Sequence, residues 1–297
     1  MEEQQDGMRR IIYIVNPVSG HRRQSKIGNA IRKETDPARI RYDIIQTEQG
    51  GHAEELSRAA ALEGADTVVA VGGDGTVNEV ARGILGTGAS LGIIPTGSGN
   101  GLARHLNLPM NFRKAIRIIN EGKIRNIDTA TLNDRLFVSL AGVGFDAYVA
   151  KKFAKSPARG FINYARIAIP SYFSFKPKKY RIVADGQQME RKALMISFAN
   201  SNQFGSNASI DPVAEIDDGF IDLCIVQKIP FFRLAFIAPA FFLRQFHKTR
   251  YVEIIRAREI LVSRKRSKKV HLDGDPWKTG REIRVKIQPL SLPVIVP

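Results

Sequence analysis

The strongest limit on the fold is a regular alternation of two patterns in the first 125 residues. Short apolar runs of β type alternate with stretches whose apolar residues recur at helical spacing. The expected strands cover residues 11–15, 40–45, 67–71 and 91–94, and the expected helices cover 27–33, 53–62, 77–85 and 112–120. Strands that alternate with helices predict a parallel sheet covered by helices. We therefore expect an α/β domain at residues 8–127.

From about residue 126 onward, alternating strands and Asp-Gly turns become more frequent. Residues 181–184, Asp185-Gly186 and 193–198 are predicted to form a strand, a turn and a strand. Helical patterns at 159–175 and 230–246 interrupt this region, and short strand patterns at 283–287 and 294–296 fit either domain. We expect a mainly antiparallel β-rich domain at residues 128–297, with the last strands free to return to the first domain.

Charge and composition narrow the class of protein. The 297 residues include 45 Lys and Arg against 29 Asp and Glu, a net charge of +16, which attracts anions such as nucleotides, nucleic acids and anionic lipids. The single cysteine, Cys224, excludes an intrachain disulfide. The most apolar stretch, residues 234–243, is shorter than the ~20 residues of a spanning helix. With no apolar segment at the start of the chain, we expect a cytoplasmic protein without a membrane anchor.

The most informative segments are glycine-rich turns that come directly after expected strands. The turn at 72–75 lies between a buried-type strand and a helix, the turn at 95–101 repeats this order, and residues 16–20 form a weaker third example. Such turns let backbone N–H groups approach phosphate oxygens, and a helix N-terminus adds positive potential. Their place after the strands of one parallel sheet is where such folds bind ligands.

The spelling of these turns excludes several known phosphate loops. There is no Walker-type G-x-x-x-x-G-K-[ST] and no protein kinase H-R-D or D-F-G set. The dinucleotide fingerprint fails because Asn78 stands at its third glycine, and Asp74 would repel a pyrophosphate unless a metal lay between them. Asp74 therefore indicates Mg²⁺.

These motifs together strongly resemble the diacylglycerol kinase and sphingosine kinase superfamily, especially its small bacterial lipid kinases. The resemblance rests on Asn16-Pro17-Val18-Ser19-Gly20, Gly72-Gly73-Asp74-Gly75-Thr76-Val77-Asn78-Glu79, Pro95-Thr96-Gly97-Ser98-Gly99-Asn100 and Asp273-Gly274-Asp275, in matching order. It implies a nucleotide-binding α/β domain, a β-rich domain, and ATP-dependent phosphorylation of a lipid hydroxyl in the cleft between them.

Residue by residue, the resemblance implies a set of ATP contacts. They are Asn16, Pro17, Val18, Ser19, Gly20, Thr47, Gly72, Gly73, Asp74, Gly75, Thr76, Val77, Asn78 and Thr96.

Three carboxylates are the catalytic candidates. An Asp-Gly turn is ordinarily a hairpin, and Asp185-Gly186 is one without evident chemistry. The resemblance implies that an acid of Asp273-Gly274-Asp275 is the base toward the lipid hydroxyl, and family members carry Glu where this chain has Asp275. Asp273 and Asp275 both stay candidates. Asp74 is expected to act through Mg²⁺, or as the base itself.

A second, structural Mg²⁺ is implied near residues 212–220. The matched ligands are the carbonyls of Glu215 and Phe220 and the side chain of Asp218, and oxygen ligands of this kind suit Mg²⁺. An acidic β-turn is the alternative interpretation.

The expected partners are those of a basic chain with a lipid substrate. We expect peripheral contact with an anionic membrane through basic residues at 151–152, 176–179 and 264–269 and aromatic residues among Phe173, Phe175, Phe231 and Phe232. The Phe-rich stretch 231–242 is nevertheless expected to be mainly a core helix. The oligomeric state is open, with a homodimer as one option.

The identity of the substrate stays open between related classes. A diacylglycerol-like lipid is favoured, followed by a sphingoid base, whose kinases have a spelling similar to Gly97-Ser98-Gly99-Asn100-Gly101. NAD kinase shares the Gly-Gly-Asp-Gly-Thr turn, but Asn78-Glu79 and the late Asp-Gly-acid turn favour the lipid branch. A nucleic-acid-binding module lacks a zinc-finger or RNA-motif spelling, so no nucleic acid partner is expected.

Overall fold

The chain divides into two compact units in the computed structural model, which describes residues 8–19, 24–156, 161–202, 210–243, 245–266 and 268–297. Unit 1 contains the N-terminal part up to Ile127 together with Ser291–Pro297, and unit 2 contains Asp128–Leu290. The chain passes between the units twice, within β5 (Ile124–Leu132) and β16 (Glu282–Ile295).

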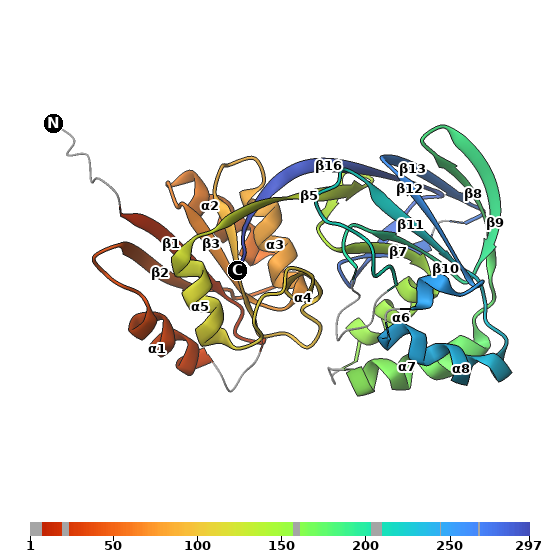
Figure 1. Cartoon of the computed structure of the whole chain (residues 1–297), viewed down its shortest axis with the longest axis horizontal. Helices are drawn as coiled ribbons and strands as arrows, with labels where there is room; N and C mark the ends of the chain where they lie inside the picture. The colour runs from red at the N-terminus through yellow and green to blue at the C-terminus, as the bar shows by residue number, and fades with distance from the viewer. Residues whose placement is uncertain (1–7, 20–23, 157–160, 203–209, 244, 267) are drawn as a thin grey trace. The chain divides into compact units, whose positions relative to one another are not determined.

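Unit 1 is built on a parallel sheet with strand order β2-β1-β3-β4, and the C-terminal end of β16 pairs in parallel with β4 through Val294 and Leu91. Its elements, drawn in Figure 1, are β1 (Arg9–Val15), α1 (Gln24–Glu34), β2 (Ile40–Gln46), α2 (His52–Leu62), β3 (Thr67–Gly72), α3 (Asp74–Ile84), β4 (Ser90–Pro95), α4 (Gly101–His105) and α5 (Phe112–Glu121).

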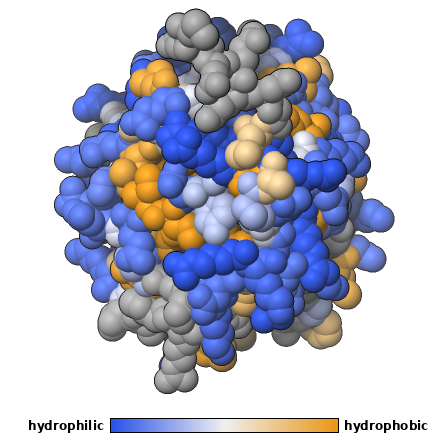
Figure 2. All heavy atoms as spheres, turned by 90° about the vertical axis from the view of Figure 1, so that its left-hand side faces the viewer, coloured by the Kyte–Doolittle hydropathy of each residue, from blue (hydrophilic) through white to orange (hydrophobic). Residues whose placement is uncertain are grey.

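Helices cover both faces of this sheet. The side chains of α1 and α5 share a core with Tyr13 and Val69, whereas α2 and α3 pack against the strands on the opposite face. Every residue of β3 and β4 is buried. Strands that are buried on both faces have apolar residues along their whole length, which is why both segments appear in the sequence as continuous apolar runs. The surface on the left of unit 1 in Figure 1 faces the viewer in Figure 2, where it is mostly hydrophilic with small hydrophobic areas.

Unit 2 is an antiparallel sandwich of two sheets with helices on one side. One sheet contains β16, β13, β8 and β9 together with β5 and β6, and the other has the order β12-β11-β10-β7-β14-β15. The remaining bounds are β6 (Arg135–Phe137), β7 (Leu140–Gly144), α6 (Phe145–Ala154), α7 (Phe161–Ser174), β8 (Lys178–Ala184), β9 (Gln187–Ala193), β10 (Met195–Ala199), β11 (Ile221–Val226), α8 (Phe231–Phe242), η1 (Phe246–Lys248), β12 (Val252–Ala257), β13 (Glu259–Arg264), β14 (Lys268–Leu272) and β15 (Asp275–Thr279).

The main core of unit 2 lies between its two sheets. Ile182 and Val262 from the first sheet meet Ile196, Phe198 and Leu223 from the second. A second core lies on the outer face of the second sheet, where α7 and α8 pack. Figure 1 shows α6, α7 and α8 gathered along this face.

The predicted fold class, a parallel α/β domain followed by a mainly antiparallel β-rich domain, is confirmed. Local details differ from the prediction. The strand paired with β8 across Asp185-Gly186 is β9, residues 187–193, and most of the predicted strand 193–198 lies in β10 of the other sheet. The two short C-terminal strand patterns are parts of one strand, β16.

Candidate active site

The three glycine-containing turns of unit 1 meet at the carboxyl ends of β1, β3 and β4. The Asn16 side-chain amide donates to the Thr76 hydroxyl over 3.0 Å, and the hydroxyls of Ser19 and Thr96 lie 2.9 Å apart. Each of these hydrogen bonds joins residues 60 or more positions apart. The fold therefore brings together predicted ATP contacts from all three turns.

Glycine is required where two of these turns touch. A Cβ on Gly97 would lie 2.5 Å from the Cα of Gly73, and a Cβ on Gly72 would lie 2.4 Å from the Thr76 side chain. Real Cβ atoms do not approach that closely, so these positions exclude any other residue without rearrangement. The result is a backbone-lined edge at the N-terminus of the eleven-residue helix α3, the arrangement that binds phosphate.

Asp74 has a structural role that was not predicted from the sequence. Its carboxylate oxygens accept hydrogen bonds from the backbone N–H groups of Asn100, over 2.9 Å, and Gly101, over 2.6 Å. Asp74 at the start of α3 thus caps the N-terminus of α4 and ties two of the turns together. Its predicted roles toward Mg²⁺ and toward a hydroxyl proton stay predictions.

Glu79 likewise caps the N-terminus of another helix, α2. Its carboxylate accepts from the N–H groups of Gly51, over 2.9 Å, and Ala53, over 3.2 Å, at the start of α2. The two acids of the segment 72–79 therefore each hold the N-terminus of a neighbouring helix, where negative charge is favourable. No local spacing signals these contacts, because the partners lie more than 25 residues away.

Two more of the predicted ATP contacts, Thr47 and Val18, lie near the same edge. Thr47 comes directly after β2, is buried, and donates its N–H to the Val15 carbonyl over 2.9 Å. Val18 is exposed, and its N–H donates to the Asn16 side chain over 3.0 Å. Gly20 lies outside the described residues.

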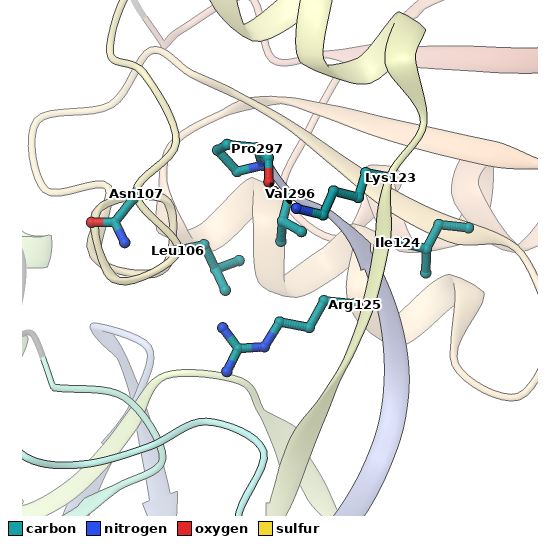
Figure 3. A pocket seen from close by; sticks show the side chains of 7 residues that line it. All are labelled: Leu106, Asn107, Lys123, Ile124, Arg125, Val296 and Pro297. Atoms are coloured by element: carbon teal, nitrogen blue, oxygen red, sulfur yellow. Dashed lines mark hydrogen bonds between the residues drawn. The ribbon is translucent and has the colours of Figure 1, made fainter.

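An open depression of about 440 Å³ in unit 1 contains none of the predicted contacts. Figure 3 shows it between the residues after α4, the start of β5 and the C-terminal end of β16. Its lining residues are Leu106, Asn107, Lys123, Ile124, Arg125, Val296 and Pro297. The Lys123 ammonium donates to the Pro297 carbonyl over 3.0 Å, so part of the lining is held together locally.

Asp273 lies in a backbone cradle in unit 2. Its carboxylate accepts from the N–H groups of Val138, Ser139 and Leu140, each over 2.8 Å, and its own N–H donates to the Leu140 carbonyl over 2.8 Å. The residue has a φ of +46°, which Asp tolerates better than most residues. Asp273 therefore anchors the start of β7 to the turn.

Asp275 differs from Asp273 in exposure. It is the first residue of β15, pairs with Leu272 across the turn, and is exposed. The structure thus separates two acids that are equivalent at the level of sequence. One is held by three N–H groups, and the other is accessible from solvent.

A buried polar network lies beneath this turn and was not predicted. The carboxylate of Asp146, at the start of α6, contacts His271 Nε2 over 3.1 Å and accepts from the Ser197 hydroxyl over 3.2 Å. All three side chains are at least nine-tenths buried. A Cβ on Gly142 would lie 1.9 Å from this carboxylate, so glycine is required there. The network connects β14, which leads into Asp273, with α6 and β10.

The segment predicted to hold a structural Mg²⁺ is organised around an arginine. The Asp218 carboxylate forms an ion pair with Arg256 of β12 and accepts from the Phe220 N–H over 3.0 Å. The guanidinium groups of Arg256 and Arg258 each lie 5.0 Å from the Phe220 ring centroid. The Asp218 charge is thus balanced by Arg256 in this arrangement. The ligand set of Glu215, Asp218 and Phe220 stays a prediction.

Three further acids lie buried in the same region. Asp211 is fully buried and Asp222 is 5% exposed, and burial together with the nearby Asp211 carboxylate raises the pKa of Asp222 to about 7. Asp128, also fully buried, accepts from the N–H groups of Gly219 and Leu290 over 2.7 Å each. No sequence signal marks these residues, because an acid in a strand or loop reads as exposed.

Comparison with known proteins matches each of the two units to a family model. Residues 10–132 match the diacylglycerol kinase catalytic domain, and residues 139–296 match the YegS C-terminal NAD kinase beta sandwich-like domain. A protein of Staphylococcus saprophyticus named diacylglycerol kinase is 30% identical over 271 residues, which cover 90% of this chain and 88% of that protein.

Further relatives agree with this assignment. The protein named "Probable lipid kinase YegS-like" from Chromohalobacter salexigens is 32% identical over 188 residues, 61% of this chain and 60% of that protein. The crystal structure of a diacylglycerol kinase from Bacillus anthracis shares the fold with a TM-score of 0.74, at 22% identity and with 97% of both chains covered. The matched catalytic domain and the relatives named diacylglycerol kinase or lipid kinase together support an ATP-dependent lipid kinase. The chain belongs to the diacylglycerol kinase family.

Proposed function

We propose that this kinase transfers the γ-phosphate of ATP to a hydroxyl of a diacylglycerol-like lipid, leaving ADP and the phosphorylated lipid. The observation that carries the proposal is the meeting of three glycine-containing turns at one edge of the unit 1 sheet. The name of the S. saprophyticus relative supports diacylglycerol as the acceptor. Phosphorylation in a cleft between the two units stays a prediction.

The phosphates of ATP would bind the turns of unit 1. The first N–H groups of α3 lack partners within the helix, as at any helix start, and its dipole favours negative charge there. Asn16, Ser19, Thr76 and Thr96 hold the turns in register through the hydrogen bonds between their side chains. In phosphoryl transfer the protein mainly positions groups and stabilises charge, and this edge is suited to both.

Asp74 is the residue that would hold Mg²⁺ beside these phosphates. When bound, the ion would neutralise phosphate charge. The contacts of Asp74 with the N–H groups of Asn100 and Gly101 fix the carboxylate at the junction of two turns, which suits an oxygen ligand.

Asp275 is the base that we propose for the lipid hydroxyl, with Asp273 as a positioning residue. A general base has to reach the proton it accepts, and Asp275 is exposed while Asp273 is engaged by three backbone N–H groups. Holding the turn fixes the direction in which β15 begins, and therefore the place of Asp275.

The test is phosphate transfer from labelled Mg-ATP to a panel of acceptors in mixed micelles. The panel contains diacylglycerol, monoacylglycerol, phosphatidylglycerol, a sphingoid base and NAD, with a lipid-free control. Label in diacylglycerol supports the proposal. Label only in the sphingoid base would make a sphingoid base, and not diacylglycerol, the substrate. Label only in NAD would contradict the phosphorylation of a lipid.

The substrate also bears on where the enzyme works. No helix within the described residues is long and apolar enough to span a membrane. We propose a cytoplasmic enzyme that associates peripherally with the membrane holding its substrate. Cell fractionation tests this proposal, since the enzyme should be released from membranes by high salt.

A further inference from the structure

Exposed hydrophobic side chains are concentrated on α7 and α8 of unit 2. Eight of the fifteen large hydrophobic side chains that are exposed among the described residues belong to these helices or to the cap of α8. They are Ile162, Tyr164, Ile169, Phe173, Phe231, Phe232, Phe236 and Leu243. The expectation that residues 231–242 form mainly a core helix is therefore wrong for part of that helix.

On α7 the exposed residues form one face. Ile162, Ile169 and Phe173 are spaced by seven and four residues, so they project from the same side of the helix, with the exposed Arg166 between them. Tyr172, next to this face, is buried, and its hydroxyl donates to the Ile229 carbonyl over 2.6 Å. One side of α7 is thus fixed to the core while the other is apolar and exposed.

On α8 the same division occurs. Leu234, Ile237 and Ala240 pack against the core of this side of unit 2. Phe232 and Phe236 are 63% and 84% exposed on the other side of the helix. The two helices join into one surface, because the rings of Phe173 and Phe231 lie 6.3 Å apart, centroid to centroid. We call this surface the α7/α8 face.

The two chain segments that contain α7 and α8 carry charged residues of a single sign. Residues 147–184 contain nine Lys or Arg and no Asp or Glu, and residues 223–252 contain five Lys or Arg and no Asp or Glu. These two segments include α7 and α8 and their flanks. With the cations Arg166, Lys228 and Arg233 on or beside it, this apolar face is complementary to an anionic, partly apolar layer.

The cations lie close to the aromatic rings. The Arg233 guanidinium is 5.5 Å from the Phe232 ring centroid, and the Lys228 ammonium donates to the Phe175 carbonyl over 2.8 Å. Long basic side chains beside apolar ones can reach lipid phosphates while the rings enter the acyl boundary. This is the arrangement of a helix that lies in a membrane interface.

We propose that the α7/α8 face docks unit 2 onto the surface of an anionic lipid bilayer. The proposal deepens the proposed function, on which it rests, by naming the surface through which the enzyme meets the membrane that holds its substrate. A second copy of the chain would fit the α7/α8 face less well than an anionic bilayer. A two-fold symmetric contact through this face would bring its cations, among them Arg166 and Arg233, close to the same cations of the second copy.

The experiment compares vesicle binding by the full chain and its variants. Vesicles of equal parts phosphatidylcholine and phosphatidylglycerol are compared with vesicles of phosphatidylcholine alone in a co-sedimentation assay. The key variant is Phe236→Ser, and the matched control is Leu62→Ser on α2, whose side chain is 70% exposed. We expect Phe236→Ser to weaken binding to the anionic vesicles about tenfold, and Leu62→Ser to leave it unchanged.

Further outcomes separate the two proposals. Activity on a short-chain diacylglycerol in free solution should be the same in Phe236→Ser as in the unchanged chain. Vesicle binding without phosphorylation of any lipid would contradict the proposed function and leave docking intact. Equal vesicle binding by Phe236→Ser and the unchanged chain would overturn docking. So would a change of oligomeric state in Phe236→Ser, measured by sedimentation, with no change in vesicle binding.

Discussion

Two hairpins of unit 2 have turns of almost identical backbone. Asp185 and Gly186 have φ values of +44° and +84°, and Asp273 and Gly274 have +46° and +92°. Each aspartate also anchors the start of a neighbouring strand. Asp185 accepts from the N–H groups of Arg258 and Glu259, as Asp273 does from those that lead into β7. The aspartate of an Asp-Gly turn is thus a structural anchor in both places.

The hairpins differ in the residue after the turn and in the backbone groups that the aspartate binds. The residue after Gly186 is Gln187, whereas the residue after Gly274 is the acid Asp275. Asp185 is exposed and holds two N–H groups, whereas Asp273 is half-buried and holds three N–H groups of buried residues. This difference is the reason we propose Asp275 as the reacting acid of the second hairpin, with Asp273 as the residue that positions it.

The substitution Asp275→Asn is expected to have the largest effect, which is a loss of kcat. Loss of a general base lowers kcat by roughly a hundredfold to ten-thousandfold, while an exposed side chain contributes little to folding. Steady-state kinetics and urea unfolding measure the two quantities. Asp275→Glu restores the carboxylate and should keep activity, and Gln187→Ala, at the matching position of the other hairpin, should change neither quantity. Full activity in Asp275→Asn would exclude it as the base.

The substitution Asp273→Asn is expected to have the next largest effect, which is a loss of stability. Asn adopts positive φ as readily as Asp, so the change mainly removes the charge that three N–H groups share. We expect the free energy of unfolding to fall by about 2 kcal/mol. Urea denaturation measures it. A variant of unchanged stability with no activity would make Asp273, and not Asp275, the reacting group.

A smaller effect is expected for Asp185→Asn. This carboxylate is exposed and has two backbone partners, so solvent compensates part of the loss. The free energy of unfolding should fall by about 0.5–1 kcal/mol, with kinase activity unchanged. If the loss equals that of Asp273→Asn, burial is not the property that separates the two turns.

The smallest effect concerns a third anchoring acid, Asp218. If Arg256 balances its charge, Arg256→Gln should lower the free energy of unfolding by roughly 0.2–0.5 kcal/mol, because such a pair is partly exposed. Addition of a chelator to the unchanged chain should leave its Tm the same. A lower Tm after chelation, restored by Mg²⁺, would instead support the ligand set of Glu215, Asp218 and Phe220.

Sequence reasoning predicted best the features that depend on local pattern. The strands of unit 1 were predicted to within a residue or two, most plainly β3 and β4, which are buried on both faces and form continuous apolar runs. Strand β9 was missed because its sequence, QQMERKA, is polar along most of an edge strand. The three turns were identified from glycine and small residues that the backbone itself requires.

Contacts between residues far apart in the chain could not be predicted from the sequence. No local sequence pattern indicates that Asp74 and Glu79 each cap another helix. Likewise, none indicates that His271 contacts Asp146, 125 residues away. The distinction between Asp273 and Asp275 likewise depends on N–H groups at 138–140. The exposed half of α8 could not be separated from its buried half, because both halves are apolar.

The decisive measurement is the stoichiometry of a single reaction containing the full chain, Mg-ATP and diacylglycerol. ADP and phosphorylated diacylglycerol are measured together over time by chromatography and mass spectrometry. If the chain is a diacylglycerol kinase in the sense proposed, the two products appear in equal amounts and neither forms without the lipid. ADP released without a phosphorylated lipid, or phosphate recovered on NAD, would contradict lipid phosphorylation by this chain.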